Sequence, residues 1–332
     1  MKKRLKNNLS TNEMIVVYII FGLSMLIGIV NPVFFGTATL ISLSRSMLVT
    51  LIFAICEMSV IISGGIDVSF PAISCISLYA TIKFLLFTGL DSPILAFAMA
   101  GLIGMAFGAL NAFLIVRFKI APLIATLGVS SVVNGATLAF LGTDEISNIP
   151  DNIDQLSKAF IYTYTSPDGI TYQLTALILI PIAVCIAAYV ILKFTMLGRG
   201  IYAIGGDKNA ARIAGFNVTK IQFIIYMTSG FFAGIGGITY MILMRQASPQ
   251  VLMGSEMMVI AAVVVGGTRI TGGHGTVIGT ILGVSLITLV QNNLIMLGVP
   301  THFQTFVVGM IIVIGTSITS IRAKKIANSA KV

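Results

Sequence analysis

The sequence predicts an all-α, polytopic membrane protein with about ten transmembrane helices, and two observations support this. Hydrophobic residues make up 57% of the 332 positions, charged residues make up only 9%, and the mean hydropathy is +1.02. A soluble domain carries about a quarter charged residues, so a chain this apolar could not cover its surface in water. The apolar residues also gather in long runs, and a helix needs about 20 of them to cross the hydrocarbon core.

The runs that could cross the membrane follow one another along almost the whole chain. They lie at 14–30, 47–63, 68–88, 93–116, 121–141, 173–194, 221–244, 276–291 and 303–319. A shorter run at 256–265 is followed directly by Gly266-Gly267, which predicts a broken helix of half length. The basic stretch before Met14 resembles a secretory signal. No small-x-small cleavage site follows Val30, so the first run is expected to remain as a helix.

Charge placement orients these segments. With the N-terminus inside, the basic residues after the fourth, sixth and eighth segments and those of the C-terminal tail all fall inside, whereas the loop 142–172 falls outside and is acidic. Lys and Arg favour cytoplasmic loops, so both termini are expected in the cytoplasm. Two places fit poorly: Arg45 falls outside, and the turn Gly64–Asp67 falls inside with no basic residue. It therefore stays open whether the second and third segments are two full crossings or a broken pair.

The chain is expected to form a single transmembrane domain over residues 1–332. Three parts would lie outside the membrane: a cytoplasmic tail at 1–13, an extracytoplasmic loop at 142–172 and a cytoplasmic loop at 195–220. None of them is long enough for a soluble domain with a core of ordinary size.

The residue supply argues against enzymatic chemistry. The three cysteines lie in apolar runs and are odd in number, so neither a disulfide framework nor a zinc site is expected. The two histidines have no partner ligands at metal spacing, and no Gly-x-x-x-x-Gly-Lys-Ser/Thr loop occurs. The formal charge of +9 could indicate nucleic acid, but the basic residues flank apolar runs, as membrane topology requires. Transport through this chain would therefore need an ion gradient or a partner as its energy source.

The inside loop 195–220 contains the signals of a short helix. Asp207 is a good N-cap, Lys208 to Ala214 can make about two turns, and Gly215 suits the following position, where φ is positive. The small residues that would let another surface approach closely are Ala210, Ala211 and Ala214. From these residues alone, an ordinary interfacial connector and a docking helix both remain open.

Glycine pairs and carboxylates inside the apolar runs form a second set of candidates. Such glycines either allow close helix packing or break helices so that the freed backbone lines a polar path. Ionisable residues inside a membrane protein usually face its interior. The residues that could line a translocation path are Gly64, Gly65, Asp67, Ser69, Glu57, Gly266 and Gly267. For the polar residues, bonding between helices is the alternative.

Four segments, in order, resemble the permeases of bacterial ribose-type sugar ABC importers. They read SGGIDVSF at 63–70, AIGGDKNAARIAGFNV at 203–218, SGFFAGIGGI at 229–238 and ASPQVLMGSEMMVIAAVVVGGTRITGGHGTVIGTILGV at 247–284. Branched-chain amino-acid permeases share the general architecture, but the Gly-Gly-Ile-Asp segment is more similar to the sugar permeases. One departure is Phe70-Pro71, where the family usually continues with Val-Gly. Proline lacks an N–H, so Pro71 is expected in the first turn of the third segment.

The resemblance implies a homodimer of permeases in the cell membrane, joined on the cytoplasmic face to ATP-binding cassette subunits. ATP and Mg would bind to those partners, and no cofactor to this chain. An extracytoplasmic solute-binding protein would deliver a small sugar, such as ribose, xylose or galactose, or a related polyol or autoinducer. The residues expected to couple to the ATPase are Asp207, Lys208, Asn209, Ala210, Ala211, Arg212, Ile213, Ala214 and Gly215. The alternatives are an ion-coupled secondary carrier of a small polar solute and a passive channel or scaffold.

Overall fold

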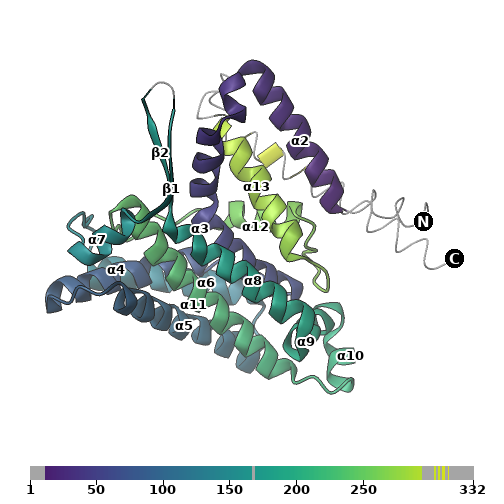
Figure 1. Ribbon diagram of the computed structural model, residues 1–332. Helices are drawn as coiled ribbons and strands as arrows, with labels where there is room; N and C mark the ends of the chain where they lie inside the picture. The colour runs from purple at the N-terminus through teal and green to yellow at the C-terminus, as the bar shows by residue number, and fades with distance from the viewer. Residues whose placement is uncertain are drawn as a thin grey trace, which may run out of the picture.

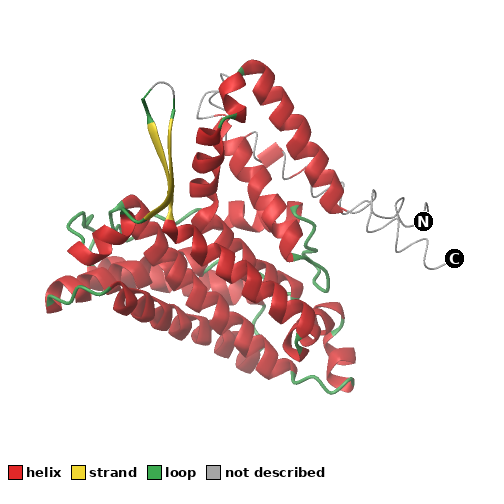
Figure 2. Ribbon diagram, viewed as in Figure 1, coloured by secondary structure: helices red, strands yellow, loops and turns green. Residues whose placement is uncertain are grey.

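The computed structural model describes residues 12–166 and 169–293, together with Phe303, Phe306, Gly309, Met310 and Val313, which are helical. This part of the chain is mainly helical (Figures 1 and 2). The elements are α2 (Asn12–Val30), η1 (Pro32–Phe35), α3 (Thr37–Ile62), α4 (Phe70–Thr88), α5 (Pro93–Phe118), α6 (Pro122–Ala136), η2 (Thr137–Leu141), α7 (Asp151–Ser157), β1 (Phe160–Thr165), β2 (Thr171–Thr175), η3 (Ala176–Ile178), α8 (Leu179–Phe194), α9 (Met196–Gly206), α10 (Lys208–Ile213), α11 (Val218–Met244), α12 (Glu256–Val265) and α13 (Val277–Asn293).

The prediction of a polytopic all-α membrane protein is confirmed. Among the described residues, seven helices are long and apolar enough to cross a membrane: α2, α3, α4, α5, α6 with η2, η3 with α8, and α11. The ten residues of α12 span about 15 Å, half of the hydrocarbon core, as predicted for a broken helix. The predicted segment 303–319, the tail 1–13 and the C-terminal end lie mostly outside the described residues.

The helices form two groups that α3 joins (Figure 1). One group contains α4, α5, α6, α8 and α11, and the other contains α2, α12 and α13. Helix α3 contacts α8 and α11 of the first group and α12 and α13 of the second. Any movement of α3 therefore affects both groups.

Glycines line a close helix crossing between α5 and α11. A Cβ atom at Gly104 would lie 2.1 Å from the carbonyl oxygen of Gly230, and one at Gly230 would lie 2.2 Å from that of Gly104. Gly108 and Gly234, each four residues further along, extend the same contact. Small residues at this spacing let backbones approach in lipid, where helices gain from packing rather than from the hydrophobic effect. The crossing holds the larger group together.

The two places that fit the charge rule poorly have structural explanations. The Nη2 atom of Arg45 donates to the carbonyl oxygen of Leu243 at 3.3 Å, at the end of α11 where free carbonyls favour a cation. The residues between α3 and α4, 63–69, are mostly buried among helices, so they form no cytoplasmic loop to which the rule would apply. Because α3 and α4 are both long enough to cross, the alternative of a broken pair is not supported. Pro71 lies in the first turn of α4, as expected.

The outside loop contains structure that was not predicted. Strands β1 and β2 form an antiparallel hairpin that follows α7 and projects away from the helices (Figure 1). The predicted start of a helix at 173 is wrong, because β2 continues to Thr175. The hydroxyl of Thr175 then accepts from the backbone N–H of Leu177 at 3.3 Å and caps η3. The hairpin and α7 lie at the opposite end of the helices from α9 and α10, which agrees with loops on opposite membrane faces.

Candidate functional site

Residues 196–206, inside the predicted cytoplasmic loop, form the additional helix α9. Thr195 caps it, since its Oγ1 atom accepts from the N–H of Gly198 at 3.2 Å. Four glycines in this helix lower its intrinsic propensity, which is why local signals do not predict it. A Cβ atom at Gly198 would lie 2.4 Å from the carbonyl oxygens of Ile191 and Leu192. Gly198 therefore lets the start of α9 pack closely against the end of α8.

Helix α10 begins where the sequence predicts. The Oδ1 atom of Asp207 accepts from the N–H groups of Asn209 at 2.7 Å and Ala210 at 3.0 Å. These hydrogen bonds, chiefly the one from Ala210, hold the pKa of Asp207 below its usual value because they favour the ionised carboxylate. The helix ends one residue earlier than predicted, with Ala214 as its C-cap, and Gly215 follows with φ +89°. The predicted capped helix is confirmed.

The side chains of α10 divide between the protein and the solvent. Ala211 is 2% exposed and packs inward, so it is not on the surface that a partner could reach. Ile213 is 88% exposed, which is unusual for a large apolar side chain beyond the membrane-spanning helices. The other exposed residues from Asp207 to Gly215 are Asp207, Lys208, Asn209, Ala210, Arg212, Ala214 and Gly215. The outer surface of α10 thus carries polar and small side chains and one large apolar side chain, Ile213.

Three glycine-rich segments meet next to the start of α10. They are the end of α3, the end of α9 and the turn between α12 and α13. The N–H of Gly273 donates to the carbonyl oxygen of Ile62 at 2.8 Å. A Cβ atom at Gly205 would lie 1.7 Å from the same oxygen and 2.4 Å from the nitrogen of Gly273. Gly64 has φ +82° and Gly272 has φ +87°, which side chains disfavour. We call this contact of backbones the glycine junction.

The predicted residues Glu57, Asp67 and Ser69 lie together in a buried polar cluster. Glu57 and Asp67 are each 1% exposed. The Oε1 atom of Glu57 accepts from the N–H of Asp67 at 3.1 Å. Asp67 accepts from the N–H of Ser69 at 2.8 Å and from its hydroxyl at 2.6 Å, and also from the hydroxyl of Ser229 at 3.2 Å. The cluster therefore holds the segment 63–69 against α3 and α11.

Two further helices contribute to this cluster. The amide of Asn111, on α5, donates to the hydroxyl of Ser69 at 2.7 Å. The hydroxyl of Thr126, on α6, accepts from the N–H of Val68 and donates to the carbonyl oxygen of Ile66, each at 3.3 Å. Within this cluster, Glu57 Oε2 and Asn111 Oδ1 are buried and lack a partner among the described residues, as does Tyr226 Oη, which lies next to Gly65. The ion pairs of the described residues all involve Asp154, so none of the basic side chains in this part of the chain pairs with the cluster. That these residues face a translocation path stays a prediction.

Gly266 and Gly267 have separate roles in the turn after α12. A Cβ atom at Gly266 would lie 2.2 Å from the carbonyl oxygen of Gly279, so this glycine lets α13 pack closely against the end of α12. Gly267 has φ +100° and makes the turn itself. The turn then continues to Gly272 and Gly273 of the glycine junction. The two predicted glycine pairs, Gly64-Gly65 and Gly266-Gly267, therefore lie in segments that meet.

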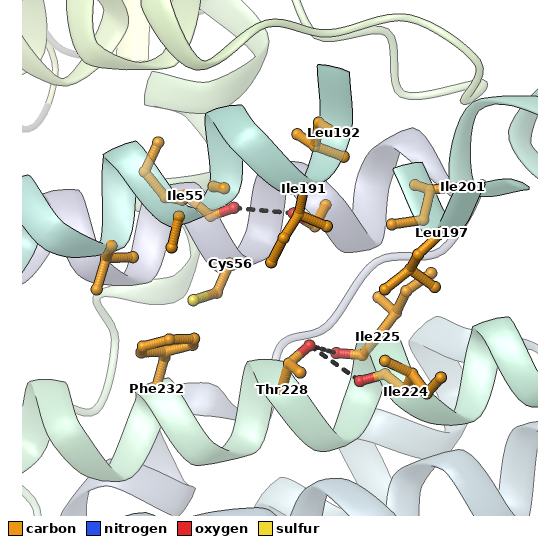
Figure 3. Close-up of a pocket in the computed structure, with 14 residues that line it drawn as sticks. Ile55, Cys56, Ile191, Leu192, Leu197, Ile201, Ile224, Ile225, Thr228 and Phe232 are labelled. Atoms are coloured by element: carbon orange, nitrogen blue, oxygen red, sulfur yellow. Dashed lines mark hydrogen bonds between the residues drawn. The ribbon is translucent and has the colours of Figure 1, made fainter. Parts of the chain in front are cut away.

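An apolar cavity of about 110 Å³ lies between α3, α8, α9 and α11 (Figure 3). Its hydroxyl groups bond to their own helices: Ser59 donates to the carbonyl oxygen of Ile55 at 3.3 Å, and Thr228 donates to those of Ile224 and Ile225 at 2.9 Å. A sugar needs polar partners for its hydroxyls once it leaves water. The cavity is therefore a poor site for a sugar.

The chain is similar to bacterial permeases over most of its length. The ribose import permease protein RbsC of Bacillus subtilis (strain 168) is 33% identical over 297 residues, 89% of this chain and 88% of that protein. The fructose import permease protein FruG of Bifidobacterium longum is 33% identical over 303 residues, 89% and 83% of the two chains. The autoinducer 2 import system permease protein LsrC of Photorhabdus luminescens is 30% identical over 313 residues, 94% and 90%. No solved structure matches the chain.

Residues 39–315 match one protein family, and this range includes the buried cluster, the glycine junction and α10. With the seven long apolar helices, the match confirms the predictions of a multi-pass protein of the cell membrane and of a transporter component rather than an enzyme. The chain belongs to the family described as branched-chain amino acid transport system / permease component.

Proposed function

We propose that this chain is the membrane-spanning permease of an ATP-binding cassette importer and that its solute is a small sugar. The family description refers to branched-chain amino acids, whereas the similar proteins are permeases for ribose, fructose, D-allose and autoinducer 2. The Gly-Gly-Ile-Asp segment, which is part of the buried cluster, supports the sugar class. Two copies of the chain would enclose the path, in the twofold arrangement that is the commonest among homo-oligomers.

The observation that carries this proposal is the position of α10. A short, capped helix on the predicted cytoplasmic face exposes Ile213 among polar and small neighbours, and it begins directly beside the glycine junction. A helix with an apolar anchor of this kind suits a groove in a partner protein. The exposed residues of Asp207–Gly215, that is all but Ala211, would dock on the ATP-binding subunit, which would also hold the ATP and Mg.

Movement of α10 would reach the transmembrane helices through the glycine junction. Gly205, two residues before Asp207, contacts the backbone of Ile62 and of Gly273 with no side chain between them. Side chains can absorb a displacement by changing rotamer, but a contact between backbones cannot. A pull on α10 would therefore move the segment 63–69 and the turn after α12, and these would open or close the path to either side.

The first experiment is to extract the tagged chain from its native membrane in mild detergent, followed by mass spectrometry and an ATPase assay. An ATP-binding cassette subunit and a solute-binding protein should co-purify, with ATP hydrolysis that vanadate inhibits and that the sugar-loaded binding protein stimulates. A pure homo-oligomer without an ATPase would contradict the proposal.

A variant of α10 tests the docking itself. Ile213→Glu places a charge at the centre of the proposed contact, so sugar-stimulated ATP hydrolysis should fall at least about tenfold. Membrane insertion should not change, because the side chain is exposed. Ile213→Leu keeps the apolar contact and serves as the control. Full stimulation in Ile213→Glu would exclude docking at this position.

One observation favours the alternative of an ion-coupled carrier. Glu57 and Asp67 are buried together without a basic partner among the residues that the structure describes, and such carboxylates occur in proton-driven transporters. This alternative predicts sugar uptake into vesicles that needs no ATPase and that a protonophore abolishes. Uptake that depends on ATP and persists with the protonophore would reject it.

A further inference from the structure

A second cavity, of about 360 Å³, lies where the two groups of helices meet on the predicted cytoplasmic side. It is bounded by the first turn of α2, the last two turns of α8, helix α9 and the start of α13. Unlike the apolar cavity of Figure 3, it has a carboxylate and an ammonium group on its wall, those of Glu13 and Lys193. We call it the charged cavity.

The charged cavity lies at the level of lipid headgroups. Glu13 is the first residue of the apolar span Glu13–Val30, and Lys193 is the last residue but one of the span Ala176–Phe194. Spans of this length match the hydrocarbon core, so their ends lie at its boundary with water. Lys193 and Tyr189 are exposed, and Ile278 is 58% exposed. The cavity therefore opens at the surface of the helices, where lipid surrounds the protein.

The carboxylate and the ammonium group share the cavity without pairing. Both ion pairs of the described residues involve Asp154, so Glu13 and Lys193 are paired neither with each other nor with another described residue. The Oε1 atom of Glu13 accepts from the hydroxyl of Thr276 at 2.5 Å, which fixes the carboxylate on the wall of the cavity. Charges at the edge of the membrane lose part of their hydration, so a ligand that carries both opposite charges would stabilise them.

Aromatic side chains hold Lys193 at the cavity. Its Nζ atom lies 4.9 Å from the ring centroid of Tyr189 and 5.5 Å from that of Phe194. The same atom donates to Tyr189 Oη at 2.6 Å, and the O–H of Tyr189 has no acceptor among the described residues. An ammonium group and a phenol O–H side by side are donors for a phosphate, whereas the carboxylate of Glu13 accepts from a primary ammonium. The two sides of the cavity therefore suit a phosphate and an ammonium.

We propose that the charged cavity binds the headgroup of phosphatidylethanolamine, with its phosphate at Lys193 and Tyr189 and its ammonium at Glu13. An anionic headgroup or a free phosphate would be repelled by the carboxylate and leave it unpaired, and a neutral sugar would pair neither charge. The acyl chains would lie along the apolar surface of α8, where Ile186, two turns from Lys193 on the same side, is 59% exposed. A lipid bound here would link the two groups of helices.

Two lipids that differ in one group test the assignment. Phosphatidylcholine carries the same two charges, but its quaternary ammonium has no N–H to donate to Glu13. The affinity of each lipid for the full chain is measured in detergent by native mass spectrometry. Phosphatidylethanolamine should bind at least about tenfold more tightly, as expected for a hydrogen bond to a charged group. Equal affinities would overturn the proposal.

Variants test the two charges separately. Glu13→Gln should bring the affinities for the two lipids to within about twofold of each other, whereas Glu145→Gln, in the outside loop, should keep the preference. Lys193→Gln should weaken the binding of both lipids, because both carry the phosphate. Lys220→Gln, at an exposed position in the first turn of α11, is its control. A preference for phosphatidylethanolamine that survives Glu13→Gln would overturn the proposal.

A soluble competitor and a cross-link distinguish a lipid from other occupants. Glycerophosphoethanolamine has the same headgroup without acyl chains and should bind more weakly, since buried CH₂ groups add affinity. A photoreactive phenylalanine derivative replaces Ile278 or, at the cytoplasmic end of α6, Ile124, which is 66% exposed. Position 278 should cross-link to phosphatidylethanolamine beyond its share of the membrane lipids, and position 124 in proportion to that share. Equal binding of glycerophosphoethanolamine, or cross-links from 278 only to other parts of this chain, would overturn the proposal.

Discussion

The two ends of the helical body are connected to it in different ways. At the predicted cytoplasmic end, α9, the end of α3 and the turn after α12 meet backbone to backbone, and a Cβ atom at Gly205 would lie 1.7 Å from the carbonyl oxygen of Ile62. At the opposite end, the hairpin contacts the body at its base and leaves Tyr162 half exposed. The first arrangement suits the transmission of movement, whereas the second leaves side chains of the hairpin outside the packed helices.

This difference has consequences for mutation. A junction without side chains has no freedom to repack, so small additions there should disturb both stability and coupling. Exposed side chains of the hairpin can change with little effect on folding, although they can change binding. The predictions below test this contrast.

The largest effect is expected in the buried cluster, where the segment 63–69 leaves α3. Asp67→Ala removes the acceptor for the N–H and hydroxyl of Ser69 and for the hydroxyl of Ser229. Each buried donor left without a partner costs about 1–3 kcal/mol, so the free energy of unfolding should fall by about 3 kcal/mol or more. Unfolding in mixed detergent micelles measures it.

Ser77→Ala is the matched control for Asp67→Ala. Ser77 lies on α4, is also buried, and its hydroxyl has no partner among the described residues. Its removal should change the free energy of unfolding by less than about 1 kcal/mol, because no hydrogen bond is lost. Similar losses for the two variants would show that the cluster adds no particular stability.

The next effect is expected at the glycine junction. Gly205→Ala adds a methyl group where the backbones of Ile62 and Gly273 leave no room. The cost should be about 1–3 kcal/mol, as for overpacking in a core, and sugar-stimulated ATP hydrolysis should fall more than basal hydrolysis does. At Gly206 a Cβ atom would meet nothing within 4 Å, so Gly206→Ala is the control. Normal coupling in Gly205→Ala would refute the role of the junction.

At the extracytoplasmic end, a substitution in the hairpin should have little effect on stability. Tyr162→Ala should lower the free energy of unfolding by no more than about 0.5 kcal/mol, because the side chain is half exposed and belongs to a hairpin outside the helix core. Thermal unfolding of the purified chain measures this. A large loss of stability would mean that Tyr162 supports the fold, and the contrast between the two ends would then disappear.

The sequence predicts the parts of this molecule that depend on local signals. Asp207 and Gly215 mark the ends of α10 because capping involves only the adjacent turn. The long helices are predicted as well, because a hydrophobic run is also a local property of the sequence. The hairpin had a local signal as well: two runs rich in threonine and aromatic residues flank Pro167-Asp168-Gly169, a typical turn sequence. That signal could have identified the strands.

The remaining features depend on contacts between distant segments. Helix α9 contains Gly205 and Gly206, which local propensity disfavours, and its packing against Ile62 and Gly273 is not visible in its own sequence. Glu57 and Asp67 are ten residues apart and meet only because the segment 63–69 is held by α5, α6 and α11. Ala211 was expected on the docking surface, and only the packing of α10 shows that it faces inward.

The smallest effect concerns pH at the outside end. Asp154 accepts from Lys158 at 2.8 Å and from Arg245 at 2.5 Å, and these bonds, the one from Lys158 first, lower the pKa of its carboxyl. The unfolded chain, with a pKa of about 3.9, takes up the proton before the folded chain as the pH falls. The stabilisation is therefore complete above that value and is lost as the pH falls through the lower folded pKa.

For these partly exposed pairs the contribution should be about 0–1 kcal/mol. Asp154→Asn removes it, so the difference in unfolding free energy between the parent chain and this variant should be constant from about pH 5 to pH 8 and should shrink in stronger acid. Added salt should reduce it as well, since the cationic partners are exposed. A difference that grows in acid would mean that protonated Asp154 is the stabilising form, and α7 would then be held by something other than these ion pairs.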